Sequence, residues 1–380
     1  MENKQEKTAP IKKKKKPMKM MDIVLYALLF VFAWTTYSQF VVFGLDVVIH
    51  AVLKLVVACV TGWLTHVAFY GMIDWREGKT FTSFWKRITA NHKKIVRNVP
   101  LITAVILSIR FRSDTPLLII ILSVVLAELI GKLMWGGFGK NIVNPVAVGF
   151  LLTDLMFEQY NRMPQAVDGM ATLIDGVTSA TPLTGIASNG WYFGSYQYAH
   201  FQAAFGNWWT LLIGHAPAPS AEMARLAILI AFAFMAYKKA LDWVIPVLYL
   251  GTVFVITTVI GFYHGFSLVY PLYHLLTGGL LFGAVFMATD PVTIPKNKPG
   301  KMIFAILLGV LTLAIRFGSL RFPEGMMLAL VVMNLLSPWL NQKAAPLAKK
   351  TPKVRLMTYG TIFIAGLLFV VLVSALNTGV

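Results

Sequence analysis

Residues 115–134 read TPLLIIILSVVLAELIGKLM, and Glu128 and Lys132 are the only charged residues in this run. A helix needs about 20 mainly apolar residues to cross the hydrocarbon core of a bilayer, and this run has that length. The surrounding chain of 380 residues is 57% hydrophobic and only 13% charged. A soluble domain exposes more charge than that, so the composition predicts a membrane protein.

Other apolar runs of similar length extend the prediction along the chain. They predict membrane-spanning helices at 22–44, 47–73, 223–237, 243–262, 267–288, 301–317, 323–341 and 356–376. Two shorter runs, 99–109 and 143–157, are typical of half-helices or short spans packed inside a bundle. We therefore expect an all-α polytopic membrane protein with ten to eleven transmembrane helices.

The basic residues predict the orientation. With a cytoplasmic N-terminus and eleven crossings, 27 of the 34 Lys and Arg residues fall on the inside, as the positive-inside rule requires. Seven of them lie between Arg76 and Arg97, whereas the longest polar stretch, Glu158 to Glu222, holds only Arg162 and is placed outside. This predicts a multi-pass protein of the inner (plasma) membrane with the C-terminus outside. The predicted regions are a basic cytoplasmic tail 1–20, a membrane domain 21–341, a basic cytoplasmic linker 342–355 and an additional transmembrane helix 356–376.

A faint internal repeat favours two related halves. Gly136-Gly137 precedes Asn144-Pro145-Val146, and Gly278-Gly279 precedes Asp290-Pro291-Val292. The two copies would enter the membrane with opposite polarity. Two inverted five-helix halves with broken helices, plus the extra C-terminal helix, can line a cavity with the backbone groups that the breaks release.

The residue inventory excludes several kinds of protein. Cys59 is the only cysteine, so disulfides and a four-cysteine iron–sulfur cluster held by this chain alone are excluded. The net charge of +18 is spread among apolar runs, which favours topology and lipid contacts over nucleic-acid binding. No metal site and no side chain that carries out catalysis by itself is predicted. Any redox chemistry must use a cofactor that needs no thiolate.

One motif in the outer stretch suggests such a cofactor. Residues 175–183 read DGVTSATPL. Thr181 followed by Pro182 is typical of a helix start, with the threonine as N-cap and the proline at the first helical position. A helix N-terminus with small neighbours suits a phosphate, so a phosphoester on Thr181 Oγ1 would hold a flavin without a cysteine.

This motif resembles the flavinylation motif of the B subunit of the sodium-translocating NADH:quinone oxidoreductase (Nqr) and the D subunit of the Rnf electron-transport complex. The resemblance covers roughly residues 95–341. It is carried by four segments in the same order, at 136–145 (GGFGKNIVNP), 178–183 (TSATPL), 286–292 (FMATDPV) and 322–329 (FPEGMMLA).

The resemblance implies an electron-transfer subunit of a membrane oxidoreductase, of the NADH:quinone or NADH:ferredoxin type. It implies covalent FMN on Thr181 at the outer face, attached by an FMN transferase, and a second flavin, riboflavin, or quinone near the glycine-rich segment. The implied partners are the other subunits of an Nqr/Rnf-like complex, an extracytoplasmic flavoprotein, quinone and membrane lipid. The FMN region comprises Thr178, Ser179, Ala180, Thr181, Pro182 and Glu222, and the quinone or second-flavin region comprises Gly136, Gly137, Gly139, Lys140 and Asn141.

The departures from the family pattern concern flavin attachment at Ser179 and ion transport at Leu133 and Asn341. Ser179 stands where the flavin motif commonly has glycine, and Leu133 and Asn341 stand where relatives tend to carry acidic residues. Asp290 and Glu128 are the remaining candidate cation ligands, since a hard cation needs oxygen donors. Because this ligand set is poorer, we expect electron transfer without Na⁺ translocation through this subunit. Asp290 is equally suited to capping a helix, and Glu128 to an ion pair inside the bundle.

Two alternatives stay open on the sequence. Inverted halves with broken helices also suit a solute channel or transporter without flavin, and fold alone does not fix function. Within the redox class, the sequence fits an Nqr-like, an Rnf-like or a third, non-pumping system.

Overall fold

The computed structural model describes residues 17–79, 84–112, 115–157, 191, 208–214, 220–318, 322 and 324–377. Within these ranges all the regular structure is helical. The predicted flavin motif at 178–183 lies outside the described residues.

The N-terminal half builds one group of helices. Glycine and proline mark several of the breaks between these helices. Gly44 lies between the first and second α-helices, and the fourth and sixth α-helices begin at Pro100 and Pro145. In order they are α1 (Pro17–Phe43), α2 (Leu45–Arg76), α3 (Phe84–Arg97), α4 (Pro100–Arg110), α5 (Leu117–Leu129), the 3₁₀ helix η1 (Leu133–Trp135) and α6 (Pro145–Met156).

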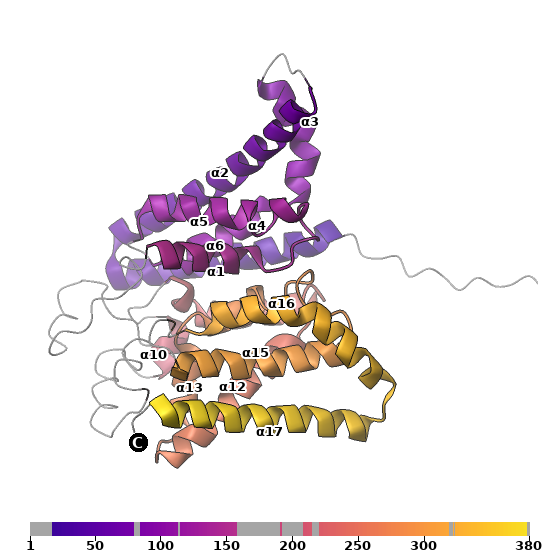
Figure 1. Cartoon of the computed structure of the whole chain (residues 1–380). Coiled ribbons are helices and arrows are strands. Elements are labelled where there is room, and N and C mark those ends of the chain that lie inside the picture. The colour runs from indigo at the N-terminus through magenta and orange to yellow at the C-terminus, as the bar shows by residue number, and fades with distance from the viewer. Residues whose placement is uncertain are drawn as a thin grey trace, which may run out of the picture.

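The C-terminal half builds a second group. Its described helices are α10 (Trp208–Ile213), η3 (Ser220–Glu222), α11 (Arg225–Tyr237), α12 (Val244–Tyr263), α13 (Val269–Leu276), α14 (Leu280–Phe286), α15 (Lys298–Gly318), α16 (Met326–Ala344), η4 (Ala345–Lys349) and α17 (Pro352–Asn377). Figure 1 shows α1, α4, α5 and α6 stacked side by side in one part of the molecule and α15, α16 and α17 in the other. The first residues of α1 and the last residues of α17 lie at opposite ends of the bundle (Figure 1).

The helices confirm the all-α, multi-pass prediction. Six described helices are long and apolar enough to cross a membrane, and three shorter apolar helices, α4, α6 and α11, accompany them. The expected span 267–288 differs in form, because it consists of α13 and α14 bent by 59° at a break. If that pair is one span the count becomes seven, so the total of ten to eleven crossings stays a prediction.

Close backbone approach explains how the short helix α6 is held. A Cβ atom on Gly149 of α6 would lie 2.4 Å from the Ser123 carbonyl oxygen of α5 and 2.6 Å from Ala127 Cβ. Small residues at such contacts let membrane helices pack through dispersion forces, since lipid supplies no hydrophobic drive between helices. Gly149 therefore sets the distance between α5 and α6.

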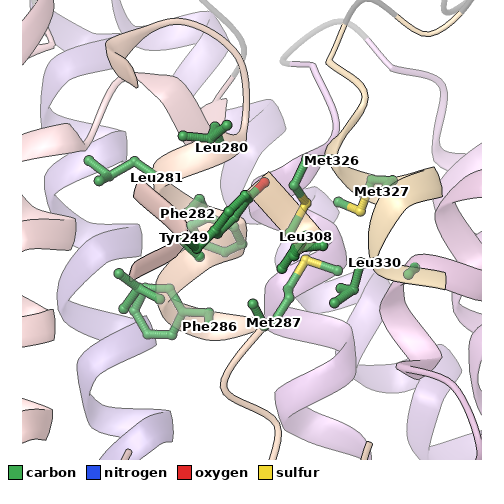
Figure 2. Packing of buried hydrophobic residues seen from close by; sticks show 14 of the residues in the cluster. Tyr249, Leu280, Leu281, Phe282, Phe286, Met287, Leu308, Met326, Met327 and Leu330 are labelled. Atoms are coloured by element: carbon green, nitrogen blue, oxygen red, sulfur yellow. The ribbon is translucent and has the colours of Figure 1, made fainter. Parts of the chain in front are cut away.

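The core of the second group is packed by large side chains from four helices. Tyr249 of α12 points toward α15 and donates or accepts a hydrogen bond with Thr312 Oγ1 at 2.9 Å. Figure 2 shows Phe282 and Phe286 of α14 packed beside Met287, with Met326 and Leu330 of α16 opposite them. All these side chains are at most 6% exposed. Flexible methionines fill the irregular space that the bent α13–α14 pair leaves.

Candidate functional site

A pocket lies between the two groups of helices, at the end of the bundle where α1 begins. About 740 Å³ of empty space lies against its lining, part of it open to the outside, and Met20 and Met21 of α1 line it. Its apolar wall includes Ile102, Ile106 and Phe286. Its polar residues are Thr103, Lys132, Asn141, Asn144, Thr289 and Asp290. An apolar pocket with a few convergent polar groups is the usual form of a cofactor or small-molecule site.

The glycine-rich segment forms a tight loop beside this pocket. Gly137 has a φ of 92°, and a Cβ there would lie 2.4 Å from Asn98 Oδ1, so only glycine fits. Asn98 Oδ1 accepts a hydrogen bond from the Phe138 amide at 2.8 Å, and Asn98 Nδ2 donates to the Tyr70 hydroxyl at 2.6 Å. Through these two hydrogen bonds Asn98 connects the loop to α2.

The loop divides the predicted quinone or second-flavin region into two parts. Phe138 and Asn141 line the pocket. Gly136, Gly139 and Lys140 are exposed and lie outside its lining. The structure therefore brings Asn141 to the pocket and leaves the Lys140 side chain on the surface.

Asn144 joins the two halves at the floor of the pocket. Its Oδ1 accepts from the Val146 and Ala147 amides, at 3.0 and 3.4 Å, and so caps α6. The side-chain Nδ2 of Asn144 donates to the Met287 carbonyl at 3.3 Å, and its backbone amide donates to Asn334 Oδ1 at 3.0 Å. Asn334 of α16 is fully buried and was not expected from the sequence, which shows only a polar residue within an apolar run.

The Asp290 carboxylate is hydrogen-bonded to residues of its own loop. It accepts from the Val292 amide at 3.0 Å and from Thr293 Oγ1 at 3.3 Å, and the Asn141 side chain hydrogen-bonds to it. These bonds hold a turn at residues 290–293, and no helix begins there, because the next helix, α15, starts at Lys298. Among the described residues no group of three or more His, Cys, Asp or Glu side chains could hold a metal ion. The cation role of Asp290 stays a prediction.

Glu128 is paired inside the bundle, as the sequence allows. The side chain is fully buried, with Oε2 2.7 Å from His66 Nε2 and Oε1 3.0 Å from Lys132 Nζ. Lys132 also donates to Thr103 Oγ1 at 2.8 Å and to the Asn98 carbonyl at 3.1 Å. Lys132 is only 3% exposed and neutralises Glu128, so its charge lies inside the bundle.

The two positions that depart from the acidic pattern are both occupied by neutral residues with structural roles. Leu133 is 2% exposed in η1. Asn341 Oδ1 accepts from the backbone amides of Lys296 and Asn297, at 2.8 and 3.1 Å. Asn341 therefore fixes the chain that enters α15.

His274 and Trp191 lie away from the pocket. Trp191, 3% exposed, stacks on the His274 ring with 6.0 Å between centroids. Arg316 donates to the His274 carbonyl at 2.8 Å, and its NH1 lies 3.4 Å from His274 Nδ1. This histidine is packed among protein groups.

The flavin motif itself cannot be placed. Thr178, Ser179, Ala180, Thr181 and Pro182 lie outside the described residues. Glu222 ends η3, and only its backbone is described.

Residues 5–350 match the NQR2, RnfD, RnfE family. The chain belongs to this family. The match contains the pocket, the Glu128 network and the predicted flavin motif, whereas α17 lies beyond it.

Three family members show how close the relationship is. The chain is 34% identical over 246 residues to the B subunit of the Na⁺-translocating NADH-quinone reductase of Chromohalobacter salexigens, covering 63% of this chain and 56% of that relative. It is 33% identical over 260 residues to the corresponding protein of Azotobacter vinelandii, covering 67% and 62%. It is 31% identical over 263 residues to the D subunit of the proton-translocating ferredoxin:NAD⁺ oxidoreductase complex of Clostridium ljungdahlii, covering 66% and 76%. The chain thus aligns with little more than half of the first of these relatives.

Proposed function

We propose that this chain is the membrane electron-transfer subunit of an Nqr/Rnf-like oxidoreductase and carries FMN as a phosphoester on Thr181. It relays electrons between an extracytoplasmic flavoprotein and quinone or another redox partner. The observation that supports this is the family match across residues 5–350, which contains the motif 178–183. The relatives named above are subunits of oxidoreductases of this kind.

The pocket supports a second redox ligand. A planar aromatic ring, as in riboflavin or quinone, suits the apolar wall of Ile102, Ile106 and Phe286. Asn141 and Asn144 would hold its polar edge, since an amide can both donate and accept hydrogen bonds. When bound, such a ring supplies reversible electron acceptance inside the membrane. The chain itself supplies the apolar enclosure, the oriented amides and the Lys132 charge.

The alternative of a solute channel or transporter receives less support. A pocket between two halves suits permeation as well as cofactor binding, but a transporter has no use for the motif at 178–183. The flavin test below separates the two.

The deciding experiment is intact-mass analysis of the protein co-expressed with an FMN transferase. We expect the wild type to carry the mass of one FMN linked with loss of water, and to fluoresce as a flavoprotein after denaturation. Thr181→Ala should lose both signals, while the neighbouring Thr184→Ala should keep them. An unchanged adduct in Thr181→Ala would disprove the attachment site, and a wild type without flavin would favour the transporter.

A further inference from the structure

The helix α3 lies across the bundle rather than along it. Figure 1 shows α3 running across the direction of α1, α5, α6 and α17. Val99 follows α3 in the left-handed conformation, with a φ of 49°, and α4 begins at Pro100. Val99 and Met20 of α1 line the same pocket, so this corner lies at the end of the bundle where α1 begins. The chain therefore turns sharply from α3 into the bundle.

Contacts with α2 fix one face of α3. Ile88 and Ile95 are at most 8% exposed and pack against Val67 of α2. Between them, Asn91 Nδ2 donates to Asp74 Oδ2 at 2.5 Å. The side of α3 that faces away from α2 is therefore held in a fixed direction.

The exposed surface of α3 is divided into two stripes. Each residue of an α-helix advances about 100° around the axis, so positions 85, 92 and 96 share one stripe and positions 86, 93 and 97 share the next. The first stripe consists of Trp85, which is 70% exposed, His92, and Val96, which is 41% exposed. The second consists of the exposed side chains Lys86, Lys93 and Arg97. A mainly apolar stripe beside a basic one is typical of a helix that lies in the membrane interface.

The charge of α3 favours an anionic partner. Five of its 14 residues are Lys or Arg and none is acidic. The acids at the end of α2 do not balance this charge, since Lys79 Nζ lies 3.5 Å from Asp74 Oδ1 and 2.5 Å from Glu77 Oε2. A bilayer with anionic lipid accounts for both stripes, because tryptophan prefers the headgroup level and lysine and arginine extend from there to the phosphates. An acidic protein surface would account only for the basic stripe.

From this geometry we infer that α3 lies in the surface of the bilayer and binds the phosphate groups of anionic phospholipids. Trp85 and Val96 lie at the level where the acyl chains begin. The basic stripe of Lys86, Lys93 and Arg97 reaches the lipid phosphates, and each cation near an anionic surface adds to the attraction. The inference depends neither on the flavin nor on the pocket.

Native mass spectrometry of the full chain in detergent tests the lipid preference. Phosphatidylglycerol and phosphatidylcholine are added separately, and the bound lipid is counted. We expect the wild type to retain phosphatidylglycerol in preference to phosphatidylcholine. The combined variant Lys86→Gln/Lys93→Gln/Arg97→Gln should retain phosphatidylglycerol at least about tenfold less, because three cations are lost from one surface.

The matched control removes the same charge elsewhere. Lys349, Lys350 and Lys353 are exposed and lie at the end of η4 and the start of α17. The combined variant Lys349→Gln/Lys350→Gln/Lys353→Gln should keep the preference for phosphatidylglycerol. The control thus separates a site on α3 from the general attraction between a basic protein and an anionic lipid.

A second measurement leaves the charges of α3 intact, so it decides the matter even if the combined variant does not fold. In a Cys59→Ala background, a spin label at Val96→Cys reports on the apolar stripe and one at Ala90→Cys on the basic side. The full chain is placed in bilayer nanodiscs. We expect the label at 96 to be reached by oxygen more than by a water-soluble nickel chelate, and the label at 90 to show the reverse.

The outcomes are exclusive. Equal retention of the two lipids by the wild type would overturn the inference, as would an equal loss of phosphatidylglycerol in the control and in the α3 variant. Labels at 90 and 96 that are equally accessible to the nickel chelate would also overturn it. Protection of position 96 from both reagents would show that protein covers this stripe in place of lipid.

Discussion

Asn144 and Asp290 make the same side-chain hydrogen bond in the two halves of the chain, although a helix follows Asn144 and a turn follows Asp290. Asn144 Oδ1 accepts from the Val146 amide and Asp290 Oδ1 from the Val292 amide, each at 3.0 Å and each across a proline. Both residues line one pocket. The repeated Asn/Asp-Pro-Val tripeptide thus makes a shared side-chain hydrogen bond, and the two copies meet where the halves join.

Asn144 should contribute strongly to stability. Asn144→Ala removes the cap of α6 and one of the two donors to the buried Met287 carbonyl, which still accepts from the Asp290 amide, and this costs on the order of 1–3 kcal/mol. We expect the apparent melting temperature in detergent to fall by several degrees. The control is Thr258→Val, which removes only a half-buried hydroxyl bonded to its own helix at Phe254. Equal melting temperatures for the two variants would show that Asn144 does not join the halves.

The spacing between α5 and α6 gives a second prediction. Gly149→Ala places a methyl group 2.4 Å from the Ser123 carbonyl and should destabilise the protein by about 1–3 kcal/mol through overpacking. Gly251→Ala, in α12, meets nothing within 4 Å and should leave stability unchanged or slightly raised. Thermal unfolding followed by size-exclusion chromatography measures both. Tolerance of alanine at 149 equal to that at 251 would contradict the close approach.

The membrane orientation can be tested by cysteine labelling. Cys59→Ala removes the only native thiol, after which Lys93→Cys in α3 and Asp168→Cys report on the two sides. We expect a membrane-impermeant maleimide to label position 93 only from the cytoplasm and position 168 only from outside. Labelling of position 168 from the cytoplasm alone would reverse the predicted topology.

Ion transport gives the fourth prediction. Leu133 offers no ligand, and the Asn341 side-chain oxygen is bonded to backbone amides. A buried Na⁺ normally needs carboxylate or several oxygen ligands to offset its desolvation. We expect the complete complex in sealed vesicles to show no ²²Na⁺ uptake through this subunit when driven with reductant. Uptake that resists a protonophore and disappears in Asp290→Asn would refute this.

The positions of the long apolar helices were predictable because apolar length alone defines a membrane span, whereas α3 (Phe84–Arg97) and α10 (Trp208–Ile213) were not predicted, because they lie outside the apolar runs. The short runs at 99–109 and 143–157 correspond to α4 and α6 within a few residues. The bend within 267–288 was missed, since hydropathy averages over the Thr277–Gly279 break between α13 and α14.

The site was predictable only in part. Asn141 and Asp290 stood out because glycine and proline mark their loops, and both line the pocket. His66 and Lys132 did not, because a lone histidine in an apolar helix and a lysine near a helix end carry no pairing signal. Only the crossing of α2 and α5 shows that both contact Glu128.

The last helix has a consequence for assembly. α17 packs along α15 and lies beyond residue 350, where the family match ends. A neighbouring subunit that approaches this flank therefore meets the exposed apolar side of α17, with Leu356, Ile364 and Leu368, before it can reach α15.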